Sequence, residues 1–216
     1  MEPQALFVLV LASLAAGWVD AVVGGGGLIL LPALLLAPGV VPVEAVATNK
    51  AVAATGTAAS SLTFYRRVRP ALTTALPTAG FAALCAGGGA AVAALVPGSV
   101  LKPIVFIALI VAALYTLLRP EMGDVTALRL SGRRHLASAF LGGGVLGFYD
   151  GIAGPGTGAF LLFLLVGGLG YAVLEASANA KIINLGTKIG ALVVFALSGV
   201  VLWPIVPFMA LANLAG

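Results

Sequence analysis

The sequence predicts an all-α polytopic membrane protein, on the basis of its composition, the length of its apolar runs and a glycine-rich break that occurs twice. Of the 216 residues, 61% are hydrophobic and 8% are charged, with a mean hydropathy of +1.17. A soluble domain carries roughly a quarter of its residues as charged side chains. A helix needs about 20 apolar residues to cross the hydrocarbon core, and several runs approach that length. Helices also satisfy their own backbone hydrogen bonds, as lipid requires.

Two halves are separated by one polar segment. We predict a first transmembrane repeat over 1–118, a cytoplasmic linker over 119–135 and a second, C-terminally short repeat over 136–216. Each repeat holds up to four spans and opens with a glycine-broken helix, which gives about seven spans in the chain. The predicted spans lie at about 5–36, 43–64, 71–96, 101–118, 136–166, 173–200 and 202–216.

The basic residues predict the orientation. They cluster after the second span and in the linker, so both loops should face the cytoplasm and the turn at 96–99 should face outward. If each interrupted segment is one crossing, the first half has four crossings and both halves enter the membrane in the same direction. We therefore predict parallel repeats, related by an axis along the membrane normal. The clustered residues are Arg66, Arg67, Arg69, Arg119, Arg129, Arg133 and Arg134.

The repeat is visible at a fixed offset of 130 positions. "GWVDAVVGGGG" from residue 17 returns in altered form as "GFYDGIAGPGTG" from residue 147. Glycine matches are common by chance in this chain, but Asp and Asn are scarce, so their pairing is the stronger signal. The paired polar residues are Asp20 and Asp150, Asn49 and Asn179, and Thr57 and Thr187.

The glycine run at 24–27 predicts a discontinuous helix. Each glycine costs roughly 1 kcal/mol of helix propensity, and irregular backbone at membrane depth needs protein or a wet cavity around it. We expect 24–27 and 154–158 to be non-helical, to face each other, and to present free N–H groups of a new helix to an anion. Close helix packing through small residues is the alternative. The backbone candidates for substrate binding are Gly25, Gly26, Gly27, Gly156 and Thr157.

One aspartate lies a turn before each break, Asp20 in "WVDA" and Asp150 in "YDGI". A carboxylate at membrane depth by default marks a proton, ion or substrate path. We therefore predict both as proton-coupling residues. In the alternative interpretation they are structural, because a carboxylate can accept hydrogen bonds from the loosened N–H groups of a broken helix.

Lysines in the next span of each half are candidates for holding an anion. Lys188 lies about ten residues beyond the polar edge of its span, too deep to reach water easily at 1.5 Å per residue. We predict it as a substrate-binding cation with Asp150 as its partner. Lys50 and Lys181 lie nearer the edges and are expected to reach toward the surface, paired with Glu44 and Glu175 respectively.

Neutral side chains on the same spans would add weaker bonds. Asn49 and Thr57 in the first half, and Asn179 and Thr187 in the second, can hydrogen-bond an anion without trapping it. All four are predicted substrate-binding residues.

Several classes of function are excluded by what the sequence contains. One cysteine, Cys85, and one histidine, His135, cannot supply a metal site, and we expect no metal or cofactor. No P-loop is present, which excludes ATP-driven transport within this chain. The basic residues lie in short loops between apolar runs, which excludes nucleic acid as a partner. His135 is expected to be a solvated loop residue.

The stretch "AAGWVDAVVGGGGLILLPALLLAPGVVPVEAVATNK" resembles the opening signature of the TauE/SafE family of membrane transporters, and "GFYDGIAGPGTGAF" is similar to that family's second copy. The resemblance implies export or uptake of small sulfur-containing or organic anions, such as sulfite and sulfonates, across the bacterial inner membrane. The second copy departs from the family pattern in its "GPGTG" and "NAK", and an eighth span, usual in the family, is not evident before Gly216.

We therefore predict a secondary transporter in the bilayer that couples a small anionic substrate to protons, and not an enzyme. A passive anion channel is an alternative from a second class. An intramembrane aspartyl protease is a third, but such enzymes usually carry "GxGD" around the second aspartate. Substrate identity, direction, coupling ion and homo-oligomerisation are left open.

Overall fold

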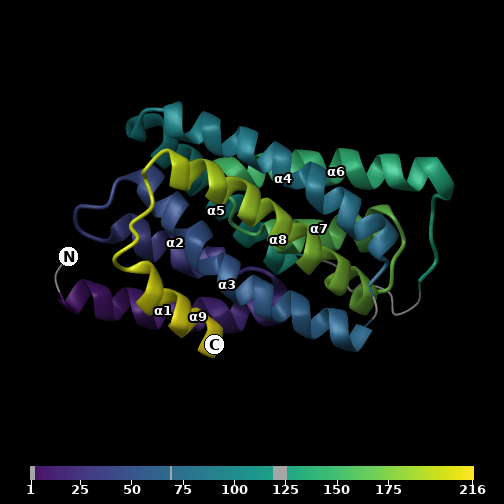
Figure 1. Ribbon diagram of the computed structural model, residues 1–216, viewed down its shortest axis with the longest axis horizontal. Coiled ribbons are helices and arrows are strands. Elements are labelled where there is room, and N and C mark those ends of the chain that lie inside the picture. The colour runs from purple at the N-terminus through teal and green to yellow at the C-terminus, as the bar shows by residue number, and fades with distance from the viewer. Residues whose placement is uncertain (1–2, 69, 119–125) are drawn as a thin grey trace.

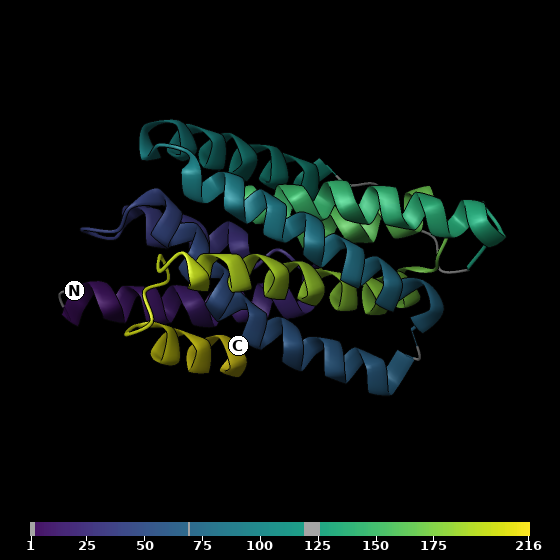
Figure 2. The ribbon, with the colours of Figure 1, turned by 45° about the horizontal axis from the view of Figure 1, so that its top comes forward.

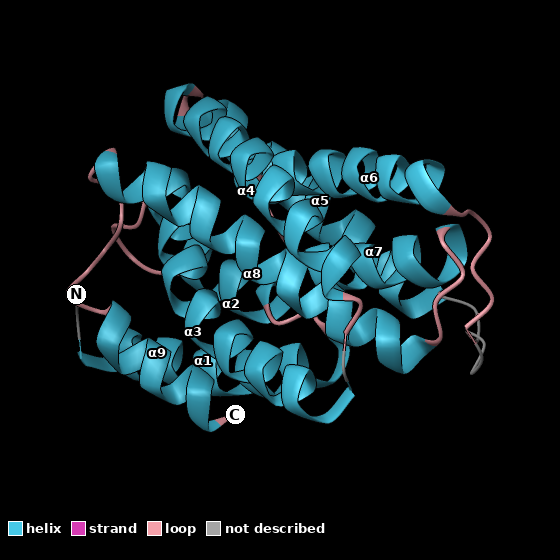
Figure 3. Ribbon diagram, turned by 45° about the vertical axis from the view of Figure 1, so that its right-hand side comes forward, coloured by secondary structure: helices cyan, strands magenta, loops and turns pink. Residues whose placement is uncertain are grey.

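The computed structural model describes residues 3–68, 70–118 and 126–216 (Figure 1), and this part of the chain is helical without a strand (Figure 3). The predicted all-α class is therefore confirmed. The helices are α1 (Pro3–Val23), α2 (Gly27–Leu36), α3 (Pro42–Val68), α4 (Leu72–Leu95), α5 (Gly98–Leu118), α6 (Gly132–Ile152), α7 (Thr157–Phe163), the π-helical turn η1 (Leu164–Gly168), α8 (Val173–Leu197) and α9 (Val206–Ala215).

Four helices among the described residues are long and apolar enough to cross a membrane. They contain the spans Pro3–Ala21, Leu72–Leu95, Gly98–Tyr115 and Val173–Leu197. Three shorter apolar helices cover Gly27–Leu36, Thr157–Gly168 and Val206–Ala215. α3 and α6 are equally long but carry more polar residues, several of them buried. The chain is thus a multi-pass membrane protein, and the predicted count of seven spans is not confirmed.

Each glycine-interrupted segment doubles back on itself. Before α6, the Ala127 and Arg129 N–H groups donate to Gly170 and Leu169 carbonyls after η1, at 2.8 and 3.1 Å, so this segment begins and ends at the same end of the bundle. In the first half, a Cβ atom on Gly26 would lie 2.4 Å from the carbonyl oxygen of Ala16, ten residues earlier. Counting these segments as single crossings is therefore wrong.

The reversal has a backbone cause. Gly24 has φ of 78°, and Gly154 and Gly156 have φ of 81° and 75°. These left-handed conformations are open to glycine at little cost, so the chain turns sharply where a mere loss of helix was expected. A hairpin returns to the side from which it started, so only α3, α4 and α5 cross the bundle between the starts of the two halves. Because three is an odd number of crossings, the second half enters the bundle from the opposite side.

The matching helices of the two halves consequently run in opposite directions. Two contacts fix the relative direction of α3 and α8. Thr57 of α3 is bonded to Lys188 of α8. Thr48 lies earlier in α3, and its hydroxyl accepts a hydrogen bond at 3.1 Å from the N–H of Leu202, which lies beyond the end of α8. The two helices are therefore antiparallel, as their opposed course in Figure 2 also shows. The predicted parallel orientation of the halves is wrong for this reason.

The two ends of the bundle differ in charge. At one end α3 and α5 begin close together, because a Cβ atom on Gly98 of α5 would lie 3.4 Å from Cδ of Pro42 of α3. At the other end α3 finishes with Arg66 and Arg67, and α6 begins with Arg133 and Arg134. We call this second end the arginine end. Arg69, Arg119 and the first residues of the linker, 119–125, lie outside the described residues.

His135 is part of the packing at the arginine end. Its side chain is buried, and its Nε2 lies 2.8 Å from the hydroxyl of Tyr171. The expectation of a solvated loop residue is wrong, because α6 begins three residues before His135 and turns it inward.

Small residues allow α4 to pack between α6 and α8. A Cβ atom on Gly147 of α6 would lie 2.4 Å from the Ala82 carbonyl oxygen, and one on Gly190 of α8 would lie 2.1 Å from that of Ala83. Such close backbone approach is the usual basis of helix association in membranes. The packing on α4 (Figure 1) thus positions α6, which carries Asp150, and α8, which carries Lys181 and Lys188.

Candidate functional site

The two chain reversals meet inside the bundle. A Cβ atom on Gly24 would lie 3.2 Å from the Gly158 backbone, and one on Gly27 would lie 3.6 Å from Cα of Pro155. The non-helical residues are 24–26 and 153–156, so α2 and α7 begin slightly earlier than the predicted ends of the breaks. The expectation that the breaks face each other is confirmed by these contacts.

Two lysines share one carboxylate at the first break, in a cluster that we call the Asp20 centre (Asp20, Thr57, Lys181 and Lys188). Both ammonium groups lie 3.7 Å from Asp20 Oδ2. Thr57 donates its hydroxyl to the same oxygen at 3.0 Å and accepts a bond from Lys188 at 2.5 Å. Lys181 also donates to the backbone carbonyl of Asp20, and Gly26 N–H donates to Asp20 Oδ1 at 3.4 Å.

A second cluster, the Asp150 centre (Asp150, Lys50 and Thr157), lies at the second break. Lys50 Nζ and Asp150 Oδ1 are 2.8 Å apart, and Thr157 donates its hydroxyl to the same oxygen at 2.7 Å. The neighbouring Tyr149 hydroxyl donates to the Pro155 carbonyl at 2.7 Å, which fastens the turn. A Cβ atom on Gly154 would lie 2.0 Å from Lys50 Nζ, so only glycine leaves room for this ion pair.

Every ion pair in the two centres joins one half of the chain to the other. Lys188, predicted to pair with Asp150, instead pairs with Asp20, and Lys50 pairs with Asp150. The antiparallel course of α3 and α8 causes this exchange, since it places each lysine beside the other half's break.

The prediction that Lys50 and Lys181 reach the surface is also wrong. Lys50 is 1% exposed and Lys181 is 6% exposed. Their expected partners are engaged elsewhere: Glu44 accepts a bond from Val41 N–H at 3.1 Å, and Glu175 accepts one from the Thr126 hydroxyl at 2.8 Å. Both lysines are thus functional candidates that sequence reasoning undervalued.

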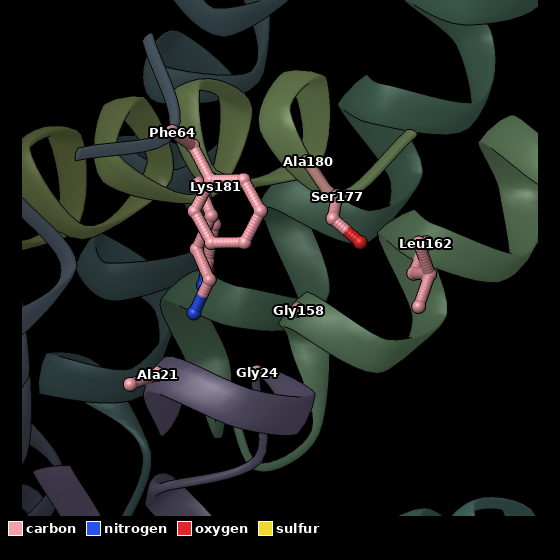
Figure 4. Close-up of a pocket in the computed structure, with 9 residues that line it drawn as sticks. Ala21, Gly24, Phe64, Gly158, Leu162, Ser177, Ala180 and Lys181 are labelled. Carbon is pink, nitrogen blue, oxygen red and sulfur yellow. The ribbon is translucent and has the colours of Figure 1, made fainter. Parts of the chain in front are cut away.

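A small cavity adjoins the Asp20 centre. The volume of this cavity is about 20 Å³, which is enough for one water molecule. Figure 4 shows the amino group of Lys181, one of the lining residues, pointing toward the segment with Ala21 and Gly24. Phe64 and Ser177 place the cavity on the side of the Asp20 centre that faces the arginine end. The lining residues are Ala21, Gly24, Phe64, Gly158, Leu162, Ser177, Ala180, Lys181 and Asn184.

Not every predicted residue reaches these centres. Asn179 lies seven residues before Gly186 on α8 and shares its face. That face packs on Ala79 of α4, opposite the face that carries Lys181. The Thr187 hydroxyl donates to the Asn184 carbonyl within its own helix at 2.8 Å. Neither residue is brought to the lysines.

The remaining predicted residues surround the breaks. Asn49 Nδ2 lies 3.7 Å from the Cβ position of Gly27. A Cβ atom on Gly156 would clash with Ala112 of α5 at 2.7 Å, so this glycine serves close packing. Gly25 is buried beside Leu28 and Val19. Asn49 and Gly27 therefore lie at the meeting point, whereas Gly25 and Gly156 shape the turns.

Several buried polar atoms near the breaks have no hydrogen-bond partner in the described protein. They include Asn49 Oδ1, Asn184 Oδ1 and Asp150 Oδ2. A buried polar atom normally finds a partner in protein, water or ligand. The Asn49 and Asn184 amide oxygens are accordingly able to accept a hydrogen bond from water or from a polar ligand.

Comparison with known proteins agrees with a transport role. The family model described as "Sulfite exporter TauE/SafE" matches residues 9–216. The chain is 39% identical over 211 residues to "Probable membrane transporter protein ORF9" of Sinorhizobium sp, covering 98% of this chain and 80% of the relative. It is 36% identical over 204 residues to "Probable membrane transporter protein YfcA" of Escherichia coli strain K12, covering 94% and 74%. No solved structure matches the chain.

Proposed function

Because this chain belongs to the TauE/SafE family of membrane transporters, we propose that it is a secondary transporter of small sulfur-containing or organic anions, such as sulfite and sulfonates, across the bacterial inner membrane. The observation that carries the proposal is the excess of buried positive charge where the two chain reversals meet. An anion entering a low-dielectric interior needs positive potential, and the two lysines on Asp20 supply it.

The arrangement of the halves supports alternating access. Equivalent residues at the offset of 130 sit on helices that run in opposite directions, which is the relation expected of inverted repeats. In such transporters the substrate site lies between the repeats, at broken helices, and access switches when one repeat moves against the other. The cross-half ion pairs lie at that interface and would have to loosen in each cycle.

The observed conformation favours access from the arginine end. The cavity lies between the Asp20 centre and that end, while Lys50 and Asp150 are 1% and 0% exposed. By the positive-inside rule the arginine end faces the cytoplasm. On this basis the Asp20 centre receives the anion from the cytoplasm, and the Asp150 centre keeps the second break closed.

Proton coupling is proposed at the aspartates, with Asp150 as the main site. Protonation would remove its negative charge and leave the Lys50 ammonium free to attract an anion. Proton binding and anion binding would then reinforce each other. A passive channel differs in that its flux would ignore an imposed proton gradient.

An aspartyl protease is disfavoured by the same ion pairs. Hydrolysis by two carboxylates needs them to act together as acid and base on one substrate. Here Asp20 is held by Lys181 and Lys188, and Asp150 by Lys50, each from the opposite half. The pairs suit a moving interface better than a catalytic dyad.

The test is uptake and efflux in vesicles that contain the purified protein, with sulfite, several sulfonates and small carboxylates, with and without a proton gradient. Lys188→Met should lower anion binding by about tenfold or more, because one of the two ammonium groups on Asp20 is lost. Lys102→Met, the same substitution at an exposed position near the start of α5, is the matched control. Wild-type affinity in the Lys188 variant would remove this residue from the site, and absence of flux for the whole panel would refute the proposed function.

A further inference from the structure

The buried charges of the described chain do not cancel. The buried side chains with full charges are Lys50, Lys181, Lys188, Asp20 and Asp150. Three ammonium groups thus face two carboxylates, which leaves one positive charge without compensation. A lone charge buried in a low-dielectric interior is costly, so a bound ion with one negative charge would stabilise the interior, whereas a second negative charge would again be unpaired.

The excess is located in one place. Lys50 and Asp150 form a one-to-one pair at 2.8 Å. Lys181 and Lys188, by contrast, share the single carboxylate of Asp20 at 3.7 Å each. The cavity of about 20 Å³ lies beside Lys181 and has room for one water molecule in the observed conformation, so the uncompensated charge adjoins a space that would widen to admit an anion.

An independent feature marks the same cavity as a ligand site. Asn184, 1% exposed, lines it, and its Oδ1 has no hydrogen-bond partner in the described protein. An amide oxygen in this position suits a hydroxyl group of an organic anion or a water molecule carried with it. One turn away on the same face of α8, Lys181 and Lys188 supply the charge.

We propose that the Asp20 centre selects its substrate by valence and accepts anions with one negative charge in preference to anions with two. The substrate class is therefore monovalent oxyanions, such as alkyl sulfonates and, for sulfite, its monovalent form hydrogensulfite, rather than sulfate or other divalent ions. This inference rests on the proposed transport function, to which it adds a rule for the charge of the cargo. The rule rests on the count of buried charges and on their placement.

Methanesulfonate and sulfate are suitable probes, because both have a tetrahedral sulfur with four substituents of similar size and they differ by one charge. Binding is measured on the purified full chain by calorimetry at one fixed, mildly alkaline pH, at which methanesulfonate carries one negative charge and sulfate carries two. The wild-type protein should bind methanesulfonate about tenfold or more tightly than sulfate, since an unpaired buried charge costs at least the 1.4 kcal/mol that a factor of ten represents.

Three substitutions then change the buried charge in steps. Asp20→Asn raises the excess from one to two, so it should shift the ratio of the two affinities toward sulfate by about tenfold or more. Lys181→Gln lowers the excess to zero and should weaken methanesulfonate binding. The double variant D20N/K181Q restores an excess of one and should restore the wild-type preference. Glu44→Gln, which removes the same charge from the first turn of α3, is the control and should change nothing.

The outcomes separate the two proposals. If the wild-type protein moves no anion, the transport function fails. If it binds both probes with equal affinity, or if Asp20→Asn leaves the ratio of affinities unchanged, only the valence rule fails. Should Asp20→Asn not fold, the comparison of Lys181→Gln with the double variant decides: no recovery of methanesulfonate binding in the double variant would overturn the rule.

Discussion

The Asp20 and Asp150 centres are built from the same kinds of groups but differ in stoichiometry and in access. Two lysines meet one carboxylate at Asp20, and one lysine meets one carboxylate at Asp150. The first adjoins a cavity, while Lys50 and Asp150 are almost completely enclosed. An open, unbalanced centre is suited to receive an anion, and a closed, balanced one is suited to hold two helices together. Equivalent positions in the two halves thus have different ionic partners.

The largest effect is expected from breaking the ion pair between Lys50 and Asp150. Asp150→Asn leaves the Lys50 ammonium buried without a counter-charge, which should cost about 3–5 kcal/mol of stability. The double variant K50M/D150N removes both charges and should recover most of that loss, because a buried ion pair is often replaceable by apolar groups. The measurement is the thermal unfolding midpoint of the purified protein in detergent.

The same substitution at the other centre serves as the comparison. Asp20→Asn should cost less, since Lys181 keeps its bond to the Asp20 carbonyl and Lys188 keeps its bond to Thr57. The thermal unfolding midpoint is again the measurement. A loss in Asp20→Asn as large as the loss in Asp150→Asn would show that the two centres are not different in kind.

A smaller effect is expected from the glycines that let the centres form. Gly154→Ala places a Cβ atom 2.0 Å from Lys50 Nζ on a backbone with φ of 81°. Gly24→Ala meets only the Gly158 backbone, at 3.2 Å, with a similar φ of 78°. Both should lose about 1 kcal/mol or more to the left-handed backbone, and Gly154→Ala should lose more because the ion pair must shift. A larger loss at Gly24 in thermal unfolding would contradict the packing of the closed pair.

Several features of the site could be predicted directly from the sequence. Asp20 and Asp150 stand out because a carboxylate in an apolar run is costly, and the glycine runs mark where helix must stop. The depth of Lys188 in its span marks it as a candidate, and Thr57 is predicted as a neutral hydrogen-bonding residue. The structure brings Thr57 and Lys188 together at Asp20.

The direction of the chain after each break could not be predicted, for a definite reason. A glycine run lowers helix propensity whether the chain continues or turns back. The positive-inside rule is equally satisfied in both cases, because the hairpin and the single crossing differ only in the side of the N-terminus, of residues 167–172 and of the chain that follows α8. None of "MEPQA", "GGLGYA" and "SGVVLWP" carries a basic residue that could decide. Without the direction, Lys50 and Lys181 could not be matched to partners in the opposite half.

The smallest expected effect concerns proton coupling, and it sharpens the comparison most. The double variant K50M/D150N keeps one excess positive charge in the interior, because one charge of each sign is removed together. Anion binding at the Asp20 centre should therefore persist.

If Asp150 is the protonation site, uptake by this variant should no longer respond to a gradient of one pH unit, which is worth about 1.4 kcal/mol for each proton. Uptake of methanesulfonate and sulfite into vesicles with and without the gradient measures this, and K102M, which leaves Asp150 in place, should behave as wild type. Coupling that survives in the double variant would move the proton to Asp20, and the open centre would then both bind the anion and carry the proton.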